Sequence, residues 1–191
     1  MKLLPVLPLV ALLAGQTQAV QRPAPPPIYP TTDDVKTRLE RQLYLADFDD
    51  VRVLLNFGSN DDERSRKFAE ALRDRVVMNT KYSADEYHIV NIEVGKLDKN
   101  LEFAKQYGVT LKAELLPMLV VLDEHGKVLA RASGKDFETS ADPAAFDPAK
   151  IAAFFTKHQA PFPDNVAPFE AAIKRAKAEG KTVFVWWSAP W

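Results

Sequence analysis

The sequence predicts an α/β protein, a three-layer sandwich with a central mixed sheet over residues 33–160. Three observations lead to this fold class. Apolar segments suited to buried strands alternate with segments whose apolar residues recur at helical spacing. Strands joined through helices favour a parallel pair with right-handed crossovers. The last two strand segments flank a short turn at 123–126, which predicts an antiparallel hairpin.

The first half of this region predicts two helices and two strands. Residues 31–34 can cap a helix whose apolar positions have helical spacing: Val35, Leu39, Leu43 and Ala46. The β-branched and aromatic run at 51–57 favours a buried strand. After a polar turn at 58–61, we expect a helix that reaches about Asn79, and then a second strand at 87–94.

The second half predicts a short helix, a hairpin and a final helix. Residues 98–107 form the short helix, and Gly108 closes it because glycine adopts a left-handed C-terminal cap most easily. The hairpin strands are expected at 118–122 and 127–131. Asp147 and Pro148 cap and start the last helix, which carries Ile151, Phe154 and Phe155.

Composition narrows the classes of function. With 25 Lys and Arg against 26 Asp and Glu, the net charge of -1 provides no positive field that could hold phosphates, so no nucleic-acid partner is expected. The sequence contains no cysteine, which excludes a disulfide, a thiolate nucleophile and a cysteine-ligated metal centre within these residues. No motif predicts a cofactor, and nothing indicates the oligomeric state.

The N-terminal residues 1–19 have the pattern of a secretory signal peptide. Lys2 precedes the uncharged run at 3–14, and a polar stretch then ends on Ala19. At 1.5 Å per residue this run covers about 18 Å, against roughly 30 Å for the hydrocarbon core of a membrane. We therefore expect a periplasmic or secreted protein with no membrane attachment after cleavage. The proline-rich residues 20–32 are expected to be an extended spacer.

The order of elements, with Pro117 directly before an apolar strand, resembles the thioredoxin superfamily over about residues 33–158. The strand at 53–57, the polar turn into a long helix, the Leu116-Pro117-Met118 step and the hairpin at 124–127 follow in that family's order. The likeness is to thioredoxin-like domains of exported bacterial redox proteins. It implies that Pro117 is cis and borders a groove for substrate, formed in this chain by Gly58, Asp61, Leu116 and Pro117.

Active members of the family carry Cys-x-x-Cys at the start of the helix after the first core strand, where the helix N-terminus lowers the pKa of a thiol. By spacing from Phe57, the two cysteine positions correspond to Asp62 and Ser65. Neither residue can form or exchange a disulfide. The resemblance therefore implies a fold and a binding groove, but no catalytic residue in this chain.

The polar residues of this turn have a structural and a ligand-binding interpretation. Ser59 or Asn60 can accept N–H bonds at the helix start, Asn60 and Glu63 resemble a capping box, and Asp61 and Asp62 favour the positive end of the helix dipole. A divalent-cation site of three carboxylates is the alternative, but consecutive helical residues diverge by about 100° and the alternating calcium-loop pattern is missing. No metal site is predicted. The histidines, in a predicted strand, in a turn and beyond the last sandwich helix, share no metal-ligand spacing: His88, His125 and His158.

Residues 161–191 look like the opening of a second thioredoxin-like domain. A helix is predicted at 165–179, ended by Gly180, followed by a strongly apolar strand at 182–187 and a turn that ends on Trp191. In such domains the first redox cysteine usually follows that tryptophan, so we expect the sequence to be truncated there. The alternative is an extra helix and edge strand packed on the first domain.

Two main functions are consistent with these patterns. The first is the N-terminal part of an exported thiol–disulfide oxidoreductase whose cysteines lie beyond Trp191, with the residues shown being redox-inactive. The second is a non-catalytic module that binds a protein or peptide substrate in the exported compartment, since pairing with an extended strand needs no cysteine. A spacer between exported domains is a third hypothesis.

Overall fold

The structure, a computed structural model, describes residues 26–32, 34–73, 86–140, 145–161 and 165–186. These residues form a four-stranded sheet in the order β2-β1-β3-β4. The central strand β1 is parallel to β2 and antiparallel to β3, and β3 pairs with β4 as the predicted antiparallel hairpin. The strands are β1 (Arg52–Gly58), β2 (Tyr87–Glu93), β3 (Met118–Leu122) and β4 (Val128–Ser133).

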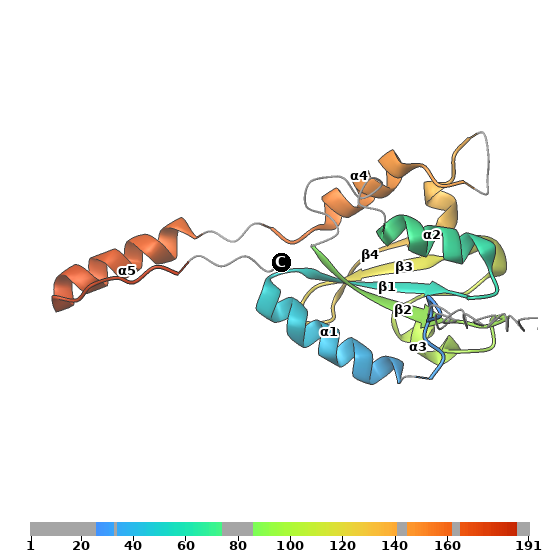
Figure 1. The fold of residues 1–191 in the computed structure, drawn as a ribbon, viewed down its shortest axis with the longest axis horizontal. Helices are drawn as coiled ribbons and strands as arrows, with labels where there is room; N and C mark the ends of the chain where they lie inside the picture. Colours follow the sequence, from blue (N-terminus) through green and yellow to red (C-terminus); the bar gives the residue numbers. More distant parts are fainter. Residues whose placement is uncertain (1–25, 33, 74–85, 141–144, 162–164, 187–191) are drawn as a thin grey trace, which may run out of the picture.

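Helices cover both faces of the sheet, which confirms the three-layer α/β sandwich (Figure 1). The helices α1 (Val35–Asp49) and α3 (Leu101–Gln106) lie on one face, and α2 (Glu63–Arg73) and α4 (Pro148–His158) lie on the other. Two short 3-10 turns, η1 (Ala113–Leu115) and η2 (Gly134–Phe137), flank the β3–β4 hairpin. Among the described helices, none has the length and apolar character that a membrane span requires.

Each face of the sheet has its own apolar core, because side chains alternate along every strand. In β1, Val53, Leu55 and Phe57 pack toward α1 and α3, whereas Leu54 packs toward α2 and α4. All of these side chains are fully buried. The central strand is therefore packed on both faces up to the turn at 59–62, which leads into α2.

Local signals set most helix ends. The Asp34 carboxylate accepts hydrogen bonds from the backbone N–H groups of Lys36 and Thr37 at 3.1 and 3.4 Å, and Asp147 caps α4 through the Ala149 N–H at 2.9 Å. Gly108, after α3, has the predicted left-handed backbone with φ of 68°. These caps confirm three of the predicted helix boundaries.

Other boundaries differ from prediction. The helix α3 begins at Leu101 rather than Asp98, because the Asp98 carboxylate accepts the Lys96 N–H at 2.9 Å and forms a turn instead. His158 is the last residue of α4 rather than lying beyond it. The predicted extension of the second helix to Asn79 and the predicted signal peptide at 1–19 both lie outside the described residues.

Part of the segment expected to be a spacer is packed against the sandwich. The Tyr29 side chain is fully buried, and the Ile28 carbonyl accepts a hydrogen bond from the Asn91 side chain at 3.3 Å. The high proline content around Tyr29 led to the spacer prediction, but a single aromatic side chain anchors this stretch. The packed unit therefore begins before Asp33.

The C-terminal helix α5 (Val166–Glu179) lies apart from the sheet and the helices that cover it (Figure 1). It ends at Gly180, which has a φ of 61°, as predicted. Residues 181–186 are not in a strand, which corrects the prediction of one at 182–187 for the described part of that range. A strand needs a neighbour for its backbone N–H and C=O groups, and no sheet partner is recorded for this segment among the described residues.

Candidate functional site

Asp62 and Ser65, which the resemblance places at the positions of the redox cysteines, bond to each other at the start of α2. The Asp62 Oδ2 atom accepts hydrogen bonds from the Ser65 backbone N–H at 2.7 Å and from the Ser65 hydroxyl at 2.6 Å. Ser65 is fully buried. The Asp62 carboxylate thus satisfies one of the free N–H groups of the first helical turn and lies at the positive end of the helix dipole. The Asp62 side chain is therefore the N-terminal cap of α2, and Ser65 is its hydrogen-bond partner.

Of the other predicted capping groups, Ser59 bonds within the turn as expected, whereas the predicted Asn60–Glu63 capping box is not formed. Ser59 Oγ accepts a hydrogen bond from the Asp61 N–H at 3.2 Å, as expected of a turn residue. Asn60 and Glu63 do not form a capping box, because Asn60 bonds to Tyr29 and Glu93 and Glu63 forms an ion pair with Lys67 at 2.8 Å. Asp62, directly before α2, takes the capping role instead.

The three consecutive carboxylates do not converge. Asp62 is engaged by Ser65, whereas Glu63 is engaged by Lys67. The Lys67 hydrogen bond and charge lower the pKa of Glu63, which is therefore ionised in its own surface pair. Within the residues that the structure describes, no group of three or more His, Asp or Glu side chains could hold a metal ion.

An open depression of about 310 Å³ lies beside the Asp62 cap. Three chain segments meet there: the β1–α2 turn, the β2–α3 turn and the segment that leads into β3. The depression has an apolar part, formed by Leu97, Ala113 and Leu116. Its charged groups are two carboxylates of the β1–α2 turn, Asp61 and Asp62, and Lys96 of the β2–α3 turn. Its full lining is Ser59, Asp61, Asp62, Gly95, Lys96, Leu97, Ala113 and Leu116.

Of the four predicted groove residues, the structure brings Asp61 and Leu116 together in this depression. Gly58 and Pro117 do not line it. Gly58 is buried at the end of β1, where an added β-carbon would overlap the Tyr29 ring. The Leu116–Pro117 peptide bond is cis, as the resemblance implies, and the buried Pro117 carbonyl accepts the Gly134 N–H at 2.7 Å. Both residues support the segments that form the depression.

Of the two polar backbone groups of Leu116, only the N–H makes a recorded hydrogen bond within the described residues. Its N–H donates to the Ala113 carbonyl at 3.3 Å within η1, a long hydrogen bond. Its carbonyl makes no recorded hydrogen bond within the described part of the chain. The carbonyl oxygen lies against Gly134, where an added β-carbon would stand 2.5 Å from it. Strand pairing at Leu116 would therefore use the N–H and replace the weak Ala113 contact.

Two side chains that the sequence did not single out hold the walls of the depression in place. Glu93, only 5% exposed, accepts the Asn60 N–H at 3.0 Å and the Gly95 N–H at 2.8 Å, and so joins the two turns. Arg64 donates to the Glu114 carbonyl at 3.2 Å and pairs with Glu138, and so joins α2 to η1. A charged residue near the end of the strand predicted at 87–94 was the available signal for Glu93; no local signal existed for Arg64.

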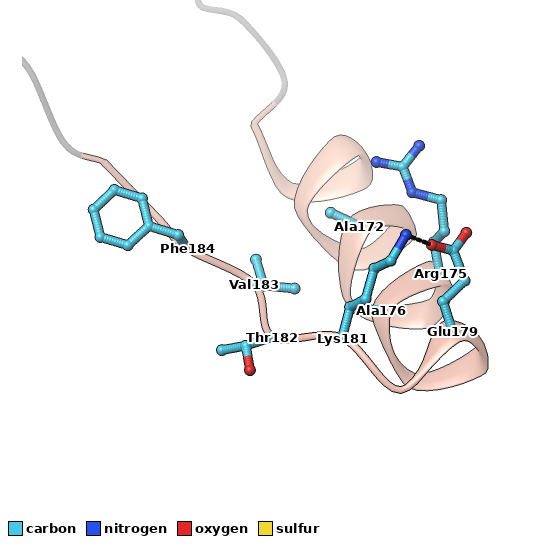
Figure 2. Close-up of a pocket in the computed structure, with 8 residues that line it drawn as sticks. All are labelled: Ala172, Arg175, Ala176, Glu179, Lys181, Thr182, Val183 and Phe184. Carbon is cyan, nitrogen blue, oxygen red and sulfur yellow. Dashed lines mark hydrogen bonds and ion pairs between the residues drawn. The ribbon is translucent and has the colours of Figure 1, made fainter.

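A second hollow, of about 500 Å³, lies between α5 and the extended segment after it (Figure 2). Its charged groups are Arg175, Glu179 and Lys181, and the last two form an ion pair at 2.6 Å. Phe184, at the other end, is 84% exposed. No nucleophile or acid–base pair converges on this hollow, and it contains none of the predicted site residues.

Neither a protein-family model nor a curated protein matches this sequence. Among solved structures, a disulphide isomerase from Xylella fastidiosa Temecula1 is similar with a TM-score of 0.55 and 27% identity, over 73% of this chain and 98% of the isomerase chain. The N21Q mutant thioredoxin from Halobacterium salinarum NRC-1 gives a TM-score of 0.42 and 17% identity over 73% of this chain and 99% of its own. Thioredoxin NaTrxh from Nicotiana alata gives a TM-score of 0.43 and 16% identity, over 71% of this chain and 96% of its own. The β2-β1-β3-β4 sheet, the cis proline before β3 and the likeness to the disulphide isomerase together show that this chain has the thioredoxin-superfamily fold.

Proposed function

We propose that this domain binds an extended segment of another polypeptide in the depression beside Asp62 and Leu116, without thiol–disulfide exchange. The observation that carries the proposal is the Asp62–Ser65 pair. Disulfide exchange requires attack by a thiolate, and oxygen side chains bonded as a helix cap cannot supply one. Binding of an extended chain requires backbone groups and side-chain pockets, which do not depend on sulfur.

The depression has the chemistry of a small side-chain pocket. Its volume of about 310 Å³ is large enough for one apolar side chain of a ligand. Leu97 and Leu116 offer apolar contact, and the Leu116 N–H, which makes only a long 3.3 Å hydrogen bond to Ala113, is a backbone group that a ligand could engage. This combination favours a peptide that places one apolar residue between residues whose backbones remain extended.

The test is capture of a fluorescein-labelled ten-residue peptide with leucine at its centre, measured by fluorescence anisotropy. Leu116→Asp should abolish capture, because a carboxylate in this pocket would lose its hydration on ligand binding. Leu116 is itself buried, so Leu97→Asp on the rim provides a second variant. Leu129→Asp, on the exposed side of β4, is the matched control and should bind as the unaltered chain does. Equal affinity in all four proteins would contradict the proposal.

The second candidate is a role in a thiol–disulfide oxidoreductase, in which this domain holds the substrate and another domain or polypeptide supplies the thiols. The 27% identity to a disulphide isomerase over 98% of that chain supports it, as does the helix and apolar segment at 165–187 that resembles the start of another thioredoxin-like unit. Fused to a domain that carries Cys-x-x-Cys, this domain should lower the KM of that domain for a scrambled protein substrate. An unchanged KM would count against a substrate-holding role.

We also propose that the protein is exported, on the basis of the charged start and uncharged run at 1–19. Cell fractionation followed by N-terminal sequencing tests this directly. The expected mature protein begins near Val20 and is found outside the cytoplasm. A cytoplasmic protein that retains Met1 would overturn this part of the proposal.

A further inference from the structure

Tyr29 lies in a socket that is built by residues distant from it in sequence. Its hydroxyl donates to the Ser65 carbonyl at 3.0 Å and accepts from the Asn56 amide at 3.2 Å. Gly58 leaves the space for its ring, since a β-carbon at this position would overlap the phenol. Burial raises the pKa of the Tyr29 hydroxyl well above its ordinary value, so the group remains a neutral donor. The socket therefore matches both the shape and the hydrogen-bonding capacity of a phenol.

The backbone around Tyr29 is also recognised. Asn60 Oδ1 accepts the Tyr29 N–H at 3.1 Å, and Asn60 Nδ2 donates to the Tyr29 carbonyl at 2.7 Å. One amide side chain thus pairs with both backbone groups of a residue, as a neighbouring strand would. Asn91 adds a hydrogen bond to the Ile28 carbonyl at 3.3 Å. These contacts recognise an extended backbone on either side of one aromatic residue.

The flanking prolines reduce the cost of this binding. Pro27 and Pro30 have fixed φ angles, and Pro30 also restricts the backbone of Tyr29, so that less conformational freedom is lost when the segment docks. Pro27 is exposed and Pro30 half-buried, which leaves Tyr29 as the anchor. The segment at 27–30 therefore contacts the sandwich as a bound peptide would contact its binding site, although both belong to the same chain.

We propose that residues 27–30 are an intramolecular ligand of a tyrosine socket, and that a separate proline-flanked, tyrosine-bearing peptide can occupy the same socket. The socket consists of Asn56, Gly58, Asn60, Ser65 and Asn91. Because Asn60 and Ser65 lie on either side of Asp62, an occupied socket also holds the start of α2 in position. The inference does not require that anything bind in the depression beside Asp62.

The test uses the full chain with Tyr29→Ala and three synthetic peptides of residues 24–32, carrying Tyr, Phe or Ala at the position of Tyr29. The Tyr peptide should raise the melting temperature of the variant in a concentration-dependent manner. The Phe peptide should bind about tenfold more weakly, because the hydroxyl contacts are lost. The Ala peptide should have no effect, and the unaltered chain, whose socket is already filled, should bind the Tyr peptide least. Equal effects of the Tyr and Ala peptides would overturn the proposal.

A second variant retains the test if Tyr29→Ala does not fold. Tyr29→Phe keeps the ring and removes only the hydroxyl, so amide hydrogen exchange at residues 65–68 should become about two- to tenfold faster. Tyr44→Phe is the matched control, since Tyr44 on α1 is 73% exposed, and exchange should be unchanged. Unchanged exchange in Tyr29→Phe would show that the phenol does not hold α2. Neither the melting temperature nor the amide exchange depends on whether the depression beside Asp62 binds a peptide.

Discussion

Asp62 carries a negative charge at the start of α2, as a redox thiolate would, but it is not a thiol nucleophile. The start of a helix stabilises a negative charge, whether the charge is on a thiolate or on a carboxylate. In this chain the carboxylate uses that field to cap α2 through Ser65, whose hydroxyl lies 2.6 Å away. Asp62 therefore places an anion at the helix start without supplying a nucleophilic thiolate.

The cap should be measurable as stability. Asp62→Ala is expected to lower the free energy of unfolding by about 1–2 kcal/mol, because the buried Ser65 hydroxyl and N–H lose their acceptor. Urea denaturation of the purified chain gives this value. Asp61→Ala is the control, since its carboxylate makes no recorded hydrogen bond in the described part of the chain, and it should stay within about 0.5 kcal/mol. Equal losses for both variants would mean that Asp62 does not cap α2.

The same two positions should accept redox chemistry. With Asp62→Cys and Ser65→Cys combined, the thiols would stand at the start of α2, where the dipole lowers their pKa. We expect this double variant to form a disulfide and to accelerate the reduction of insulin by dithiothreitol, while the unaltered chain leaves the reaction at its uncatalysed rate. A double variant that remains inert would show that the surroundings of Asp62 and Ser65 no longer support exchange.

At the scale of secondary-structure elements, α1 is held at its start by an exposed carboxylate. The hydrogen bond from the Thr37 hydroxyl, followed by that from the Lys36 N–H, lowers the pKa of Asp34 below its ordinary value of 3.8. A lowered folded-state pKa means that the contribution of Asp34 to stability is present above the unfolded pKa and is lost as the pH falls through the folded pKa.

The stability difference between the unaltered chain and Asp34→Ala should therefore depend on pH. At pH 7 the variant should be the less stable of the two. As the pH falls below about 4, the difference should narrow, because the protonated carboxyl no longer accepts both backbone N–H groups as well. Urea midpoints at a series of pH values measure this. A difference that is the same at pH 7 and at pH 2.5 would contradict the role given to Asp34.

Short-range sequence signals were sufficient to predict many helices and strands, but they were insufficient to predict the contacts that form the candidate site. Asp34, Asp147 and Gly108 act within a turn of the chain, so the sequence predicts the helix ends that they set. Contacts from Tyr29 to Asn60 and from Arg64 to Glu138 join residues far apart in sequence, and no spacing rule reveals them. The apolar run after Gly180 has the composition of a strand, but composition does not provide the neighbouring strand that it needs.

At the scale of the whole molecule, the sandwich and α5 are separate in the structure (Figure 1). The sandwich has a core on each face of its sheet, whereas α5 and the segment after it expose large apolar side chains: Val166, Phe169, Phe184, Val185 and Trp186. Exposed apolar residues in an unpaired extended segment favour aggregation between molecules. Among the described residues, neither core includes a side chain from α5 or from residues 181–186.

A chain that ends at Pro161 should accordingly keep the melting temperature of the 191-residue chain within about 2 °C, because no core side chain is removed. It should also remain monodisperse at higher concentration. Differential scanning calorimetry and light scattering on the two proteins provide the comparison. A clearly lower melting temperature for the shorter chain would indicate that α5 and residues 181–186 pack on the sandwich in solution.

The missing β-carbon at Gly58 has a consequence for relatives of this protein. The Tyr29 ring and a side chain at position 58 compete for one volume, so substitutions at the two positions should be correlated during divergence. A relative with any larger residue at position 58 should lack the aromatic residue at position 29. That pair of alignment columns would then identify which members of the group carry their N-terminal extension as part of the folded domain.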